Sequence, residues 1–359
     1  YYLPFNTVSM LVSLLFSNIT LSFLINLAQV LVLLGLVKES LSLIGVVFIG
    51  SMLSGFVVLD KRKRMEVIRA GFFVGIIQAG LYLLFIEKNF LLISGWLLNG
   101  LLSAIVVLGI LPIFEFLFRT ITNITLLELA DFNHPLLQKL VLEAPGTYHH
   151  SLIVGNLSEN AAKAINANSL LARIGAYYHD IGKLSKPEYF SENQVSLNES
   201  KHENLHPNVS KLVIMNHVKE GLSMAKKYHL HPRIIDFILQ HHGTSLVYYF
   251  YRRALENLTN DNESLSEETF RYPGPKPQTK ETAIVLLADS VEAAVRTLRE
   301  PSASQIRDMV HKIINNKFID GQLDECDLTL RDLEKIASVF IHILTGIYHK
   351  RIVYPEEKP

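Results

Sequence analysis

Cysteine is nearly absent from this chain of 359 residues. Its only cysteine, Cys326, excludes an intrachain disulfide and favours a reducing compartment for the part of the chain that carries it. Net charge is absent as well, because 34 Lys and Arg residues balance 34 Asp and Glu residues. Without a basic field over the whole chain, the sequence does not predict binding to DNA or RNA.

Histidine is missing from the beginning of the chain. All fourteen histidines lie at position 134 or later, whereas almost all of the excess in hydrophobic residues, which make up 49% of the chain, lies before residue 119. This division predicts a transmembrane helical region at 1–119 and a soluble domain at 120–359.

An initiator methionine is also missing. The chain begins Tyr-Tyr-Leu-Pro, without a basic region followed by an apolar stretch and a cleavage site. The start is therefore not typical of a signal peptide, and we expect the chain to begin inside a longer protein.

Long apolar runs indicate membrane spans in the first region. Three of the runs have 17 to 19 residues and the last has 29, enough for a helix to cross a hydrocarbon core of about 30 Å. A shorter run, Val8 to Phe16, is the remainder of a further span, so we expect four to five spans. The four long runs are Leu21–Val37, Leu41–Leu59, Ala70–Ile86 and Phe90–Phe118.

Basic residues set the expected orientation. The cluster Lys61-Arg62-Lys63-Arg64 lies between the second and third long runs and is expected on the cytoplasmic side. The last run then returns the chain to the same side, so everything from Arg119 onward is predicted to be cytoplasmic. The expected location is the plasma or inner membrane, with the lipid bilayer as a partner.

The soluble half shows the periodicity of amphipathic helices. No alternating strand pattern is present, so we predict an all-α domain with two irregular stretches, at 185–207 and 259–280. The predicted helices are a junction helix at Leu126–Val141, then Asn156–Ile165, Leu170–Tyr178, Val209–Tyr228, Pro232–His241, Thr282–Glu300, Ala303–Phe318 and Leu330–Tyr348.

Histidines and aspartates form an ordered series along these helices. Five imidazoles and two carboxylates in helical surroundings suit divalent metals that accept mixed nitrogen and oxygen ligands. A bound metal pair can produce a hydroxide at neutral pH that attacks a phosphodiester. The members are His150, His179, Asp180, His217, His241, His242 and Asp289.

Residues next to this series extend the hypothesis. We place the His179-Asp180 pair on a helix, with Lys183 on the same face, where its ammonium can meet a phosphate oxygen. The pair His241-His242 repeats adjacent ligands near a helix end, where Gly243 frees the backbone. Arg296 lies about two turns after Asp289 and is placed for bidentate contact with a phosphate.

Each of these residues has an ordinary reading when taken alone. A single histidine is more often a surface or core residue than a ligand, and an isolated arginine is more often a solvated helix charge. The joint pattern within one helical domain favours the metal site. The histidines that the site does not need are His149, His202, His206, His229, His231, His311, His342 and His349.

The ordered run H…HD…H…HH…D resembles the HD hydrolase superfamily. The segments EAPGTYHHSLIVGNL, YYHDIGK, NHVKEGLSMA, DFILQHHGTSLVYYFY and FRYPGPKPQTKETAIVLLADSVEAAVRTL resemble, more narrowly, the seven-transmembrane HD hydrolases, bacterial membrane phosphodiesterases that open cyclic di-AMP to a linear dinucleotide. The resemblance covers the last membrane spans and essentially all of residues 120–350.

This resemblance implies polytopic transmembrane helices followed by a cytoplasmic helical HD domain that holds two Fe or Mn ions. The seven residues of the series are the implied ligands, and Lys183 and Arg296 are implied phosphate contacts. The implied substrate is a cyclic dinucleotide, and a homodimer is an open option. Family members carry a further N-terminal span and a large extracytoplasmic domain that this sequence does not show.

The hypothesis is a two-metal phosphodiester hydrolysis. His150, His179, Asp180 and Asp289 are expected to hold one ion, and Asp180 is expected to share the other with His217, His241 and His242. Lys183 and Arg296 would offset charge on the phosphoryl oxygens. Tyr272 and its RYPGPKPQ loop either shape a nucleotide pocket or serve only the fold.

Two alternatives stay open. One is another HD activity, on cyclic di-GMP, guanosine alarmones or deoxynucleotide triphosphates. Enzymes that act on cyclic di-GMP carry a GYP signature shortly after the His-His pair, whereas this chain has Gly243-Thr244-Ser245-Leu246. The other is a membrane receptor whose HD module binds nucleotide without cleaving it, and the complete ligand series argues against that reading.

Overall fold

The structure, a computed structural model, describes residues 4–36, 41–86, 88–194, 201–203, 205–257 and 265–348. Val37, His349 and the parts of the two predicted irregular stretches at 195–200, 204 and 258–264 lie outside the described residues. The chain divides into two compact units, Tyr1–Leu129 and Ala130–Pro359. The roles predicted for 1–119 and 120–359 stay predictions.

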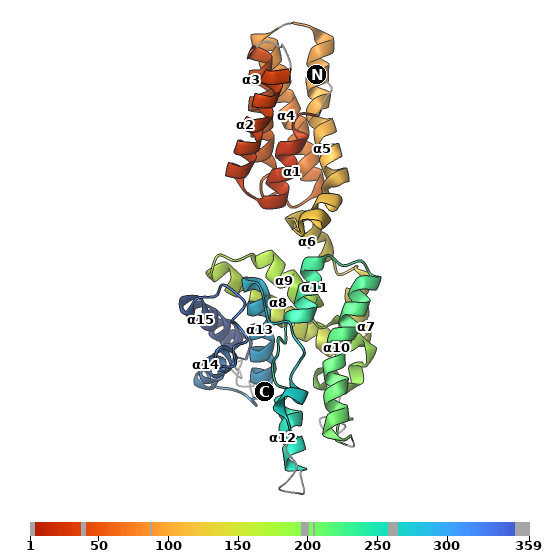
Figure 1. Ribbon diagram of the computed structural model, residues 1–359, viewed down its shortest axis with the longest axis vertical. Helices are drawn as coiled ribbons and strands as arrows, with labels where there is room; N and C mark the ends of the chain where they lie inside the picture. The colour runs from red at the N-terminus through yellow and green to blue at the C-terminus, as the bar shows by residue number, and fades with distance from the viewer. Residues whose placement is uncertain are drawn as a thin grey trace, which may run out of the picture. The chain divides into compact units, whose positions relative to one another are not determined.

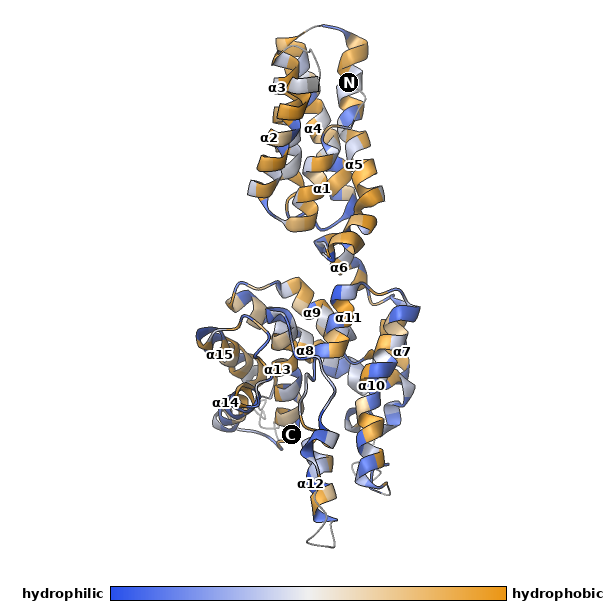
Figure 2. Ribbon diagram, in the orientation of Figure 1, coloured by the Kyte–Doolittle hydropathy of each residue, from blue (hydrophilic) through white to orange (hydrophobic). Residues whose placement is uncertain are grey.

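The first unit is a helical bundle in which α4 packs against α3 and α5, and α1 packs against α2, α3 and α5 (Figure 1). The orange colour of hydrophobic residues predominates on the ribbons of these helices (Figure 2). The elements are α1 (Thr7–Phe16), α2 (Ile19–Leu36), α3 (Leu41–Val58), α4 (Arg64–Phe85), α5 (Phe90–Phe118) and α6 (Asn123–Leu129).

Three of these helices, α3, α4 and α5, are long and apolar enough to cross a membrane, while α1 and α2 count as shorter apolar helices within the described residues. Each of the predicted apolar runs therefore forms a helix over most of its described residues. The 29-residue run forms one helix with Pro112 inside it. Many apolar side chains of this unit are exposed, which suits contact with lipid.

Glycine permits a close helix contact in this unit. A Cβ on Gly100 of α5 would overlap backbone atoms of Gly71 and Gly75 on α4. Without side chains at these positions, the two helix backbones approach each other directly, as is common between membrane helices.

The predicted junction helix at Leu126–Val141 is wrong, because the structure contains two helices there. The first, α6, ends at Leu129, and α7 (Pro135–Glu143) begins after a turn in which His134 accepts a hydrogen bond from the Leu136 amide. Pro135 has no amide hydrogen to continue an earlier helix, but it suits the first turn of a new one.

The second unit is all-helical, as predicted. Among the described residues, the single β feature is an isolated bridge between Leu246 and Arg271. Its α-helices after α7 are α8 (Pro145–Ala164), α9 (Ser169–Tyr178), α10 (Pro207–Lys227), α11 (Pro232–Gln240), α12 (Tyr248–Glu256), α13 (Lys280–Arg296), α14 (Ala303–Ile319) and α15 (Leu330–Ile347).

Two helices of this unit differ from the prediction. Helix α8 begins at Pro145 rather than Asn156, so it includes His150, and α12 was not predicted. Helix α13 lies at the centre of the unit and packs against α8, α9, α11 and α14 (Figure 1). The irregular stretches contain short 3-10 helices, η2 (Pro187–Tyr189), η3 (Ser191–Asn193) and η4 (Glu267–Phe270).

Candidate metal centre

The seven side chains predicted as ligands come together in two groups that share Asp180. In each group, one donor atom per residue lies within 4.8 Å of every other. The groups coincide with the two sets expected from the sequence. One consists of His150, His179, Asp180 and Asp289, and the other of Asp180, His217, His241 and His242.

The His179-Asp180 pair lies at a helix end rather than inside a helix, so that part of the sequence interpretation is wrong. Helix α9 ends at Tyr178, His179 is its C-cap, and the 3-10 helix η1 (Ile181–Ser185) follows Asp180. A Cβ on Gly182 would overlap the carbonyl oxygen of His217. Glycine therefore lets this turn press against α10 and brings Asp180 to His217.

Proline marks the starts of three other helices that position donors, and glycine follows the end of one of them. Helices α8, α10 and α11 each begin with proline at their first position, which fixes where they start. His241 is the C-cap of α11, and Gly243 takes a left-handed φ of 54°. The turn that follows α11 thus directs His241 and His242 into one site, as predicted.

Asp180 is placed to serve both groups with different oxygens. Its Oδ1 lies 3.4 Å from His217 Nε2 and 3.6 Å from His241 Nε2. Its Oδ2 lies 3.2 Å from His179 Nε2 and 3.7 Å from His150 Nε2. This carboxylate, which is 1% exposed, can therefore join two cations.

The arrangement of the donor atoms suits the binding of cations better than it suits hydrogen bonds among the side chains. His217 Nε2 and His241 Nε2 face each other at 3.1 Å, although both rings are buried. Among the described residues, His179 Nε2 and Asp180 Oδ1 are buried without a hydrogen-bond partner. Buried polar atoms normally have partners, so this convergence indicates that a positive ion completes the site.

Three rings are oriented by the backbone. The Nδ1 atom of His179 lies 2.6 Å from the carbonyl oxygen of Ala176, and that of His217 lies 2.6 Å from the carbonyl oxygen of Ile214. His241 Nδ1 lies 3.0 Å from the Ile238 carbonyl. Each Nδ1 can donate its hydrogen there, which leaves the Nε2 lone pair free for a metal.

Burial and neighbouring charges set the protonation of the site. Burial lowers the pKa of His217 to about 4 and holds the pKa of His242 well below its usual range, so both rings are neutral at neutral pH. Burial would raise the pKa of Asp289, but the hydrogen bond from His150 and the nearby histidines keep it low. Neutral imidazoles and ionised carboxylates are the forms that bind metals.

One buried carboxylate at the site, Glu292, was not among the predicted residues. Its Oε2 lies 2.5 Å from His150 Nδ1, while His150 Nε2 lies 3.1 Å from Asp289 Oδ1. Burial would lower the pKa of His150, yet these two carboxylates raise it to about 10 in the metal-free protein. The spacing of three residues from Asp289 on one helix is the sequence feature that could have revealed Glu292.

Lys183 and Arg296 share a second carboxylate that sequence reasoning missed. Lys183 Nζ lies 2.7 Å from Asp180 Oδ2 and 2.7 Å from Glu192 Oε1. Arg296 Nη2 lies 3.8 Å from Glu192 Oε2. Burial would lower the pKa of Lys183, but the carboxylates of Asp180 and Glu192 raise it, so the lysine stays charged. Lys183 thus contacts the shared candidate ligand Asp180 directly, whereas Arg296 is connected to it through Glu192.

Tyr272 lies at the site as well. Its ring stacks on the ring of His242, with centroids 4.3 Å apart, and burial raises the pKa of its phenol.

Three of the histidines set aside in the sequence have ordinary roles. His206 and His231 cap α10 and α11, and His202 Nε2 lies 2.8 Å from the Tyr189 carbonyl.

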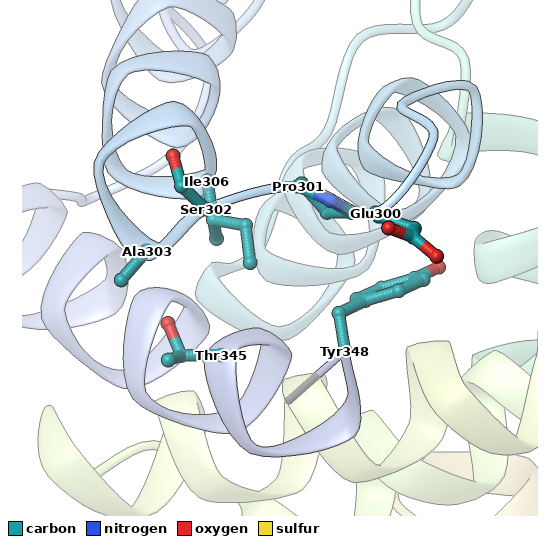
Figure 3. Close-up of a pocket in the computed structure, with 7 residues that line it drawn as sticks. All are labelled: Glu300, Pro301, Ser302, Ala303, Ile306, Thr345 and Tyr348. Carbon is teal, nitrogen blue, oxygen red and sulfur yellow. The ribbon is translucent and has the colours of Figure 1, made fainter. Parts of the chain in front are cut away.

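A pocket of about 350 Å³ lies elsewhere in this unit, between the start of α14 and the end of α15 (Figure 3). Glu300 and Tyr348 point toward one another at its edge. None of the seven candidate ligands lines it. The pocket is therefore separate from the candidate metal centre.

Two known families match the two units. Residues 147–294 match the family described as HD domain, and residues 1–122 match the family described as 7TM receptor with intracellular HD hydrolase. The chain belongs to this family of membrane HD hydrolases.

Similar proteins support this membership. The cyclic-di-AMP phosphodiesterase PgpH of Bacillus subtilis is 44% identical over 87% of this chain and 45% of its own length. PgpH of Listeria monocytogenes is 45% identical over 83% of this chain and 42% of its own length. The chain thus spans less than half the length of these curated relatives.

A solved structure covers the second unit. This chain resembles the crystal structure of the L. monocytogenes PgpH HD domain in complex with cyclic-di-AMP, and the two sequences are 49% identical. The match covers 62% of this chain and 100% of the crystallised chain, with a TM-score of 0.57. The helical HD fold of residues after the membrane unit is therefore established.

Proposed function

We propose that this protein is a metal-dependent phosphodiesterase that hydrolyses cyclic di-AMP to the linear dinucleotide pApA at the membrane. The observation that carries the proposal is the placement of Asp180, whose two oxygens face two groups of metal donors. The similarity to two cyclic-di-AMP phosphodiesterases supports the choice of substrate.

We assign one ion to His150, His179, Asp180 and Asp289, and the other to Asp180, His217, His241 and His242. The mixed imidazole and carboxylate donors accept Fe and Mn among other divalent metals, and we propose one of these two because of the resemblance to the membrane HD hydrolases. When bound, two such ions supply a nucleophilic hydroxide at neutral pH and polarise the phosphoryl group.

The remaining residues act on the substrate. Hydrolysis adds water across a P–O3′ bond, so that the water oxygen bonds to phosphorus and O3′ leaves with a proton. We assign Lys183 and Arg296 to bind the phosphoryl oxygens and offset their charge, a role supported by the contact of Lys183 with Asp180 and by the contact of Arg296 with Glu192. The Tyr272 ring, exposed by 7%, forms an edge of the nucleotide site through its contact with His242.

The location of the reaction follows from the helices of the first unit. The chain is a membrane protein with several candidate spans. We propose that the HD unit faces the cytoplasm, because the basic cluster Lys61–Arg64 lies at the start of α4 and favours that side. Size measurements in detergent would test whether the chain forms a homodimer.

Anaerobic metal analysis combined with a nucleotide panel tests the proposal on the full chain in detergent. We expect two ions per chain and conversion of cyclic di-AMP to pApA. Faster turnover of cyclic di-GMP, an alarmone or a deoxynucleotide triphosphate would assign another HD activity. Tight binding of cyclic di-AMP by the metal-loaded protein, without any linear product over hours, would make it a receptor.

A further inference from the structure

His150 differs from three of the other four candidate histidine ligands in what holds its ring. His179, His217 and His241 direct Nδ1 to backbone carbonyl oxygens, whereas His150 Nδ1 meets the carboxylate of Glu292 at 2.5 Å. A carboxylate is a stronger acceptor than a carbonyl, because it carries a full negative charge. The ring of His150 is therefore held more firmly, and made more basic, than the rings held by carbonyls.

One helix contacts both nitrogens of this ring. Asp289 and Glu292 are three residues apart on α13 and so lie on the same face of that helix. Asp289 Oδ1 lies 3.1 Å from His150 Nε2, and Glu292 reaches Nδ1 on the other side of the ring. The ring, which belongs to α8, is clamped by α13, the central helix of the unit.

Among the residues that the structure describes, Glu292 has no ion-pair partner other than His150. Its side chain is 2% exposed, and among the described residues no Lys or Arg nitrogen lies within 4.0 Å of it. A buried carboxylate is costly unless it is paired. A hydrogen bond to a ring that binds a cation through its other nitrogen supplies the missing positive charge.

We propose that Glu292 is a positioning residue that accepts the Nδ1 hydrogen of His150, directs Nε2 toward the cation of the first group, and strengthens that metal site selectively. This inference rests on the proposed metal assignment, but it does not depend on which nucleotide is cleaved. A purely structural role, in which the hydrogen bond only joins α8 to α13, makes a different prediction for metal binding.

Titration calorimetry of the metal-free full chain with Mn²⁺ separates the two roles. We expect two sites in the unchanged protein. Glu292→Ala is expected to weaken one site by about 10- to 100-fold and to leave the other unchanged. Glu292→Gln keeps an acceptor but loses the charge, so its effect should be smaller in the same site.

The matched control is Glu281→Gln on the same helix. Glu281 accepts a hydrogen bond from the Asn168 amide but contacts none of the candidate ligands, so its loss should leave both affinities unchanged. Electron paramagnetic resonance gives a second readout. In Glu292→Ala at intermediate Mn²⁺, the coupled signal of a metal pair should give way to the hyperfine pattern of a single ion.

Unchanged affinities in both Glu292 variants would overturn the inference. So would equal weakening of both sites together with a lower melting temperature, because that result indicates a structural role. Two sites in the unchanged protein without cleavage of cyclic di-AMP would refute the proposed substrate while leaving the role of Glu292 intact.

Discussion

The two units of this protein bury polar side chains in different ways. Apart from Glu115, whose carboxylate accepts hydrogen bonds from the Thr122 amide and the Thr125 hydroxyl, the polar groups buried in the described residues of the first unit are neutral amides and hydroxyls. Several of them bond to one another: Asn6 Nδ2 lies 2.8 Å from Gln78 Oε1 and 3.2 Å from Asn99 Oδ1. The second buries charged groups, among them Asp180 and Lys183. Asp180 lies with histidines in the two groups of candidate metal donors.

The difference shows what each kind of buried polarity can do. Neutral groups that satisfy one another tie helices together and need nothing further, which suits a bundle with lipid around it. The ring nitrogens of His217 and His241 face each other, and two lone pairs in this arrangement are satisfied only when a cation lies between them. Burial of polar groups in the first unit therefore indicates packing, and burial in the second indicates chemistry.

Asp180→Ala should have the largest effect, because it removes the only donor shared by both groups. We expect cyclic di-AMP hydrolysis to fall to background and metal content to fall below two ions per chain. Activity assays and metal analysis check this. Asp308→Ala, at an exposed position of α14, is the matched control and should behave like the unchanged protein.

Lys183→Met tests the neighbouring charge. Removing an ammonium that offsets transition-state charge should lower kcat by about 100-fold or more. KM should change less, since the substrate keeps its other contacts. Steady-state kinetics with Lys312→Met, an exposed lysine of α14, as the control would measure this. A loss confined to KM would mean that Lys183 contributes binding alone.

Removal of the metal should destabilise the second unit. Mn²⁺ at about 100 times its dissociation constant stabilises the folded state by about 2.7 kcal/mol. Thermal unfolding with and without chelator should show a lower melting temperature without metal, and added Mn²⁺ should restore it. An equal melting temperature in both conditions would contradict a site formed only in the folded unit.

The pH dependence of metal binding follows from His150. In the metal-free protein its pKa is raised from 6.5 to about 10, so the ring is protonated at neutral pH and must lose a proton to bind metal. Its contribution to the stability of the metal-free fold is complete below pH 6.5 and lost as the pH rises through about 10. Apparent Mn²⁺ affinity should therefore increase by about tenfold per unit between pH 7 and 9.

Calorimetry in buffers of different ionisation enthalpy measures the proton released by this step. We expect about one proton per chain at pH 7.5, and no release would contradict the protonated state of His150. The neutral rings of His217 and His242 should add nothing in this range, since their pKa values lie well below it.

Gln78→Leu should have the smallest effect. It removes the hydrogen bond from Asn6 in the first unit, and interhelical bonds of this kind contribute about 0.6 kcal/mol on average. Unfolding in detergent should show a slight loss of stability, while Mn²⁺ affinity stays unchanged. A loss of metal binding would break the distinction between the two units.

Apolar periodicity predicted most helices, and the adjacent His-Asp and His-His pairs identified four of the seven donors. His150, His217 and Asp289 lie outside such pairs and were included through the ordered series that resembles the HD hydrolases. Contacts across the fold were less accessible. Glu292 meets His150 across 142 positions, so its spacing of three residues from Asp289 was the single local sign of its role. Glu192 lies in a stretch without periodicity and had no local signature. The break before Pro135 was visible in the sequence but was overridden by the apolar periodicity on both sides.

The central claim is that Asp180 joins two cations. The most direct measurement is an anomalous-scattering map of crystals of the manganese-loaded protein. The account predicts two peaks, one among His150, His179 and Asp289 and the other among His217, His241 and His242, with Asp180 between them. A single peak, or peaks away from these residues, would contradict it.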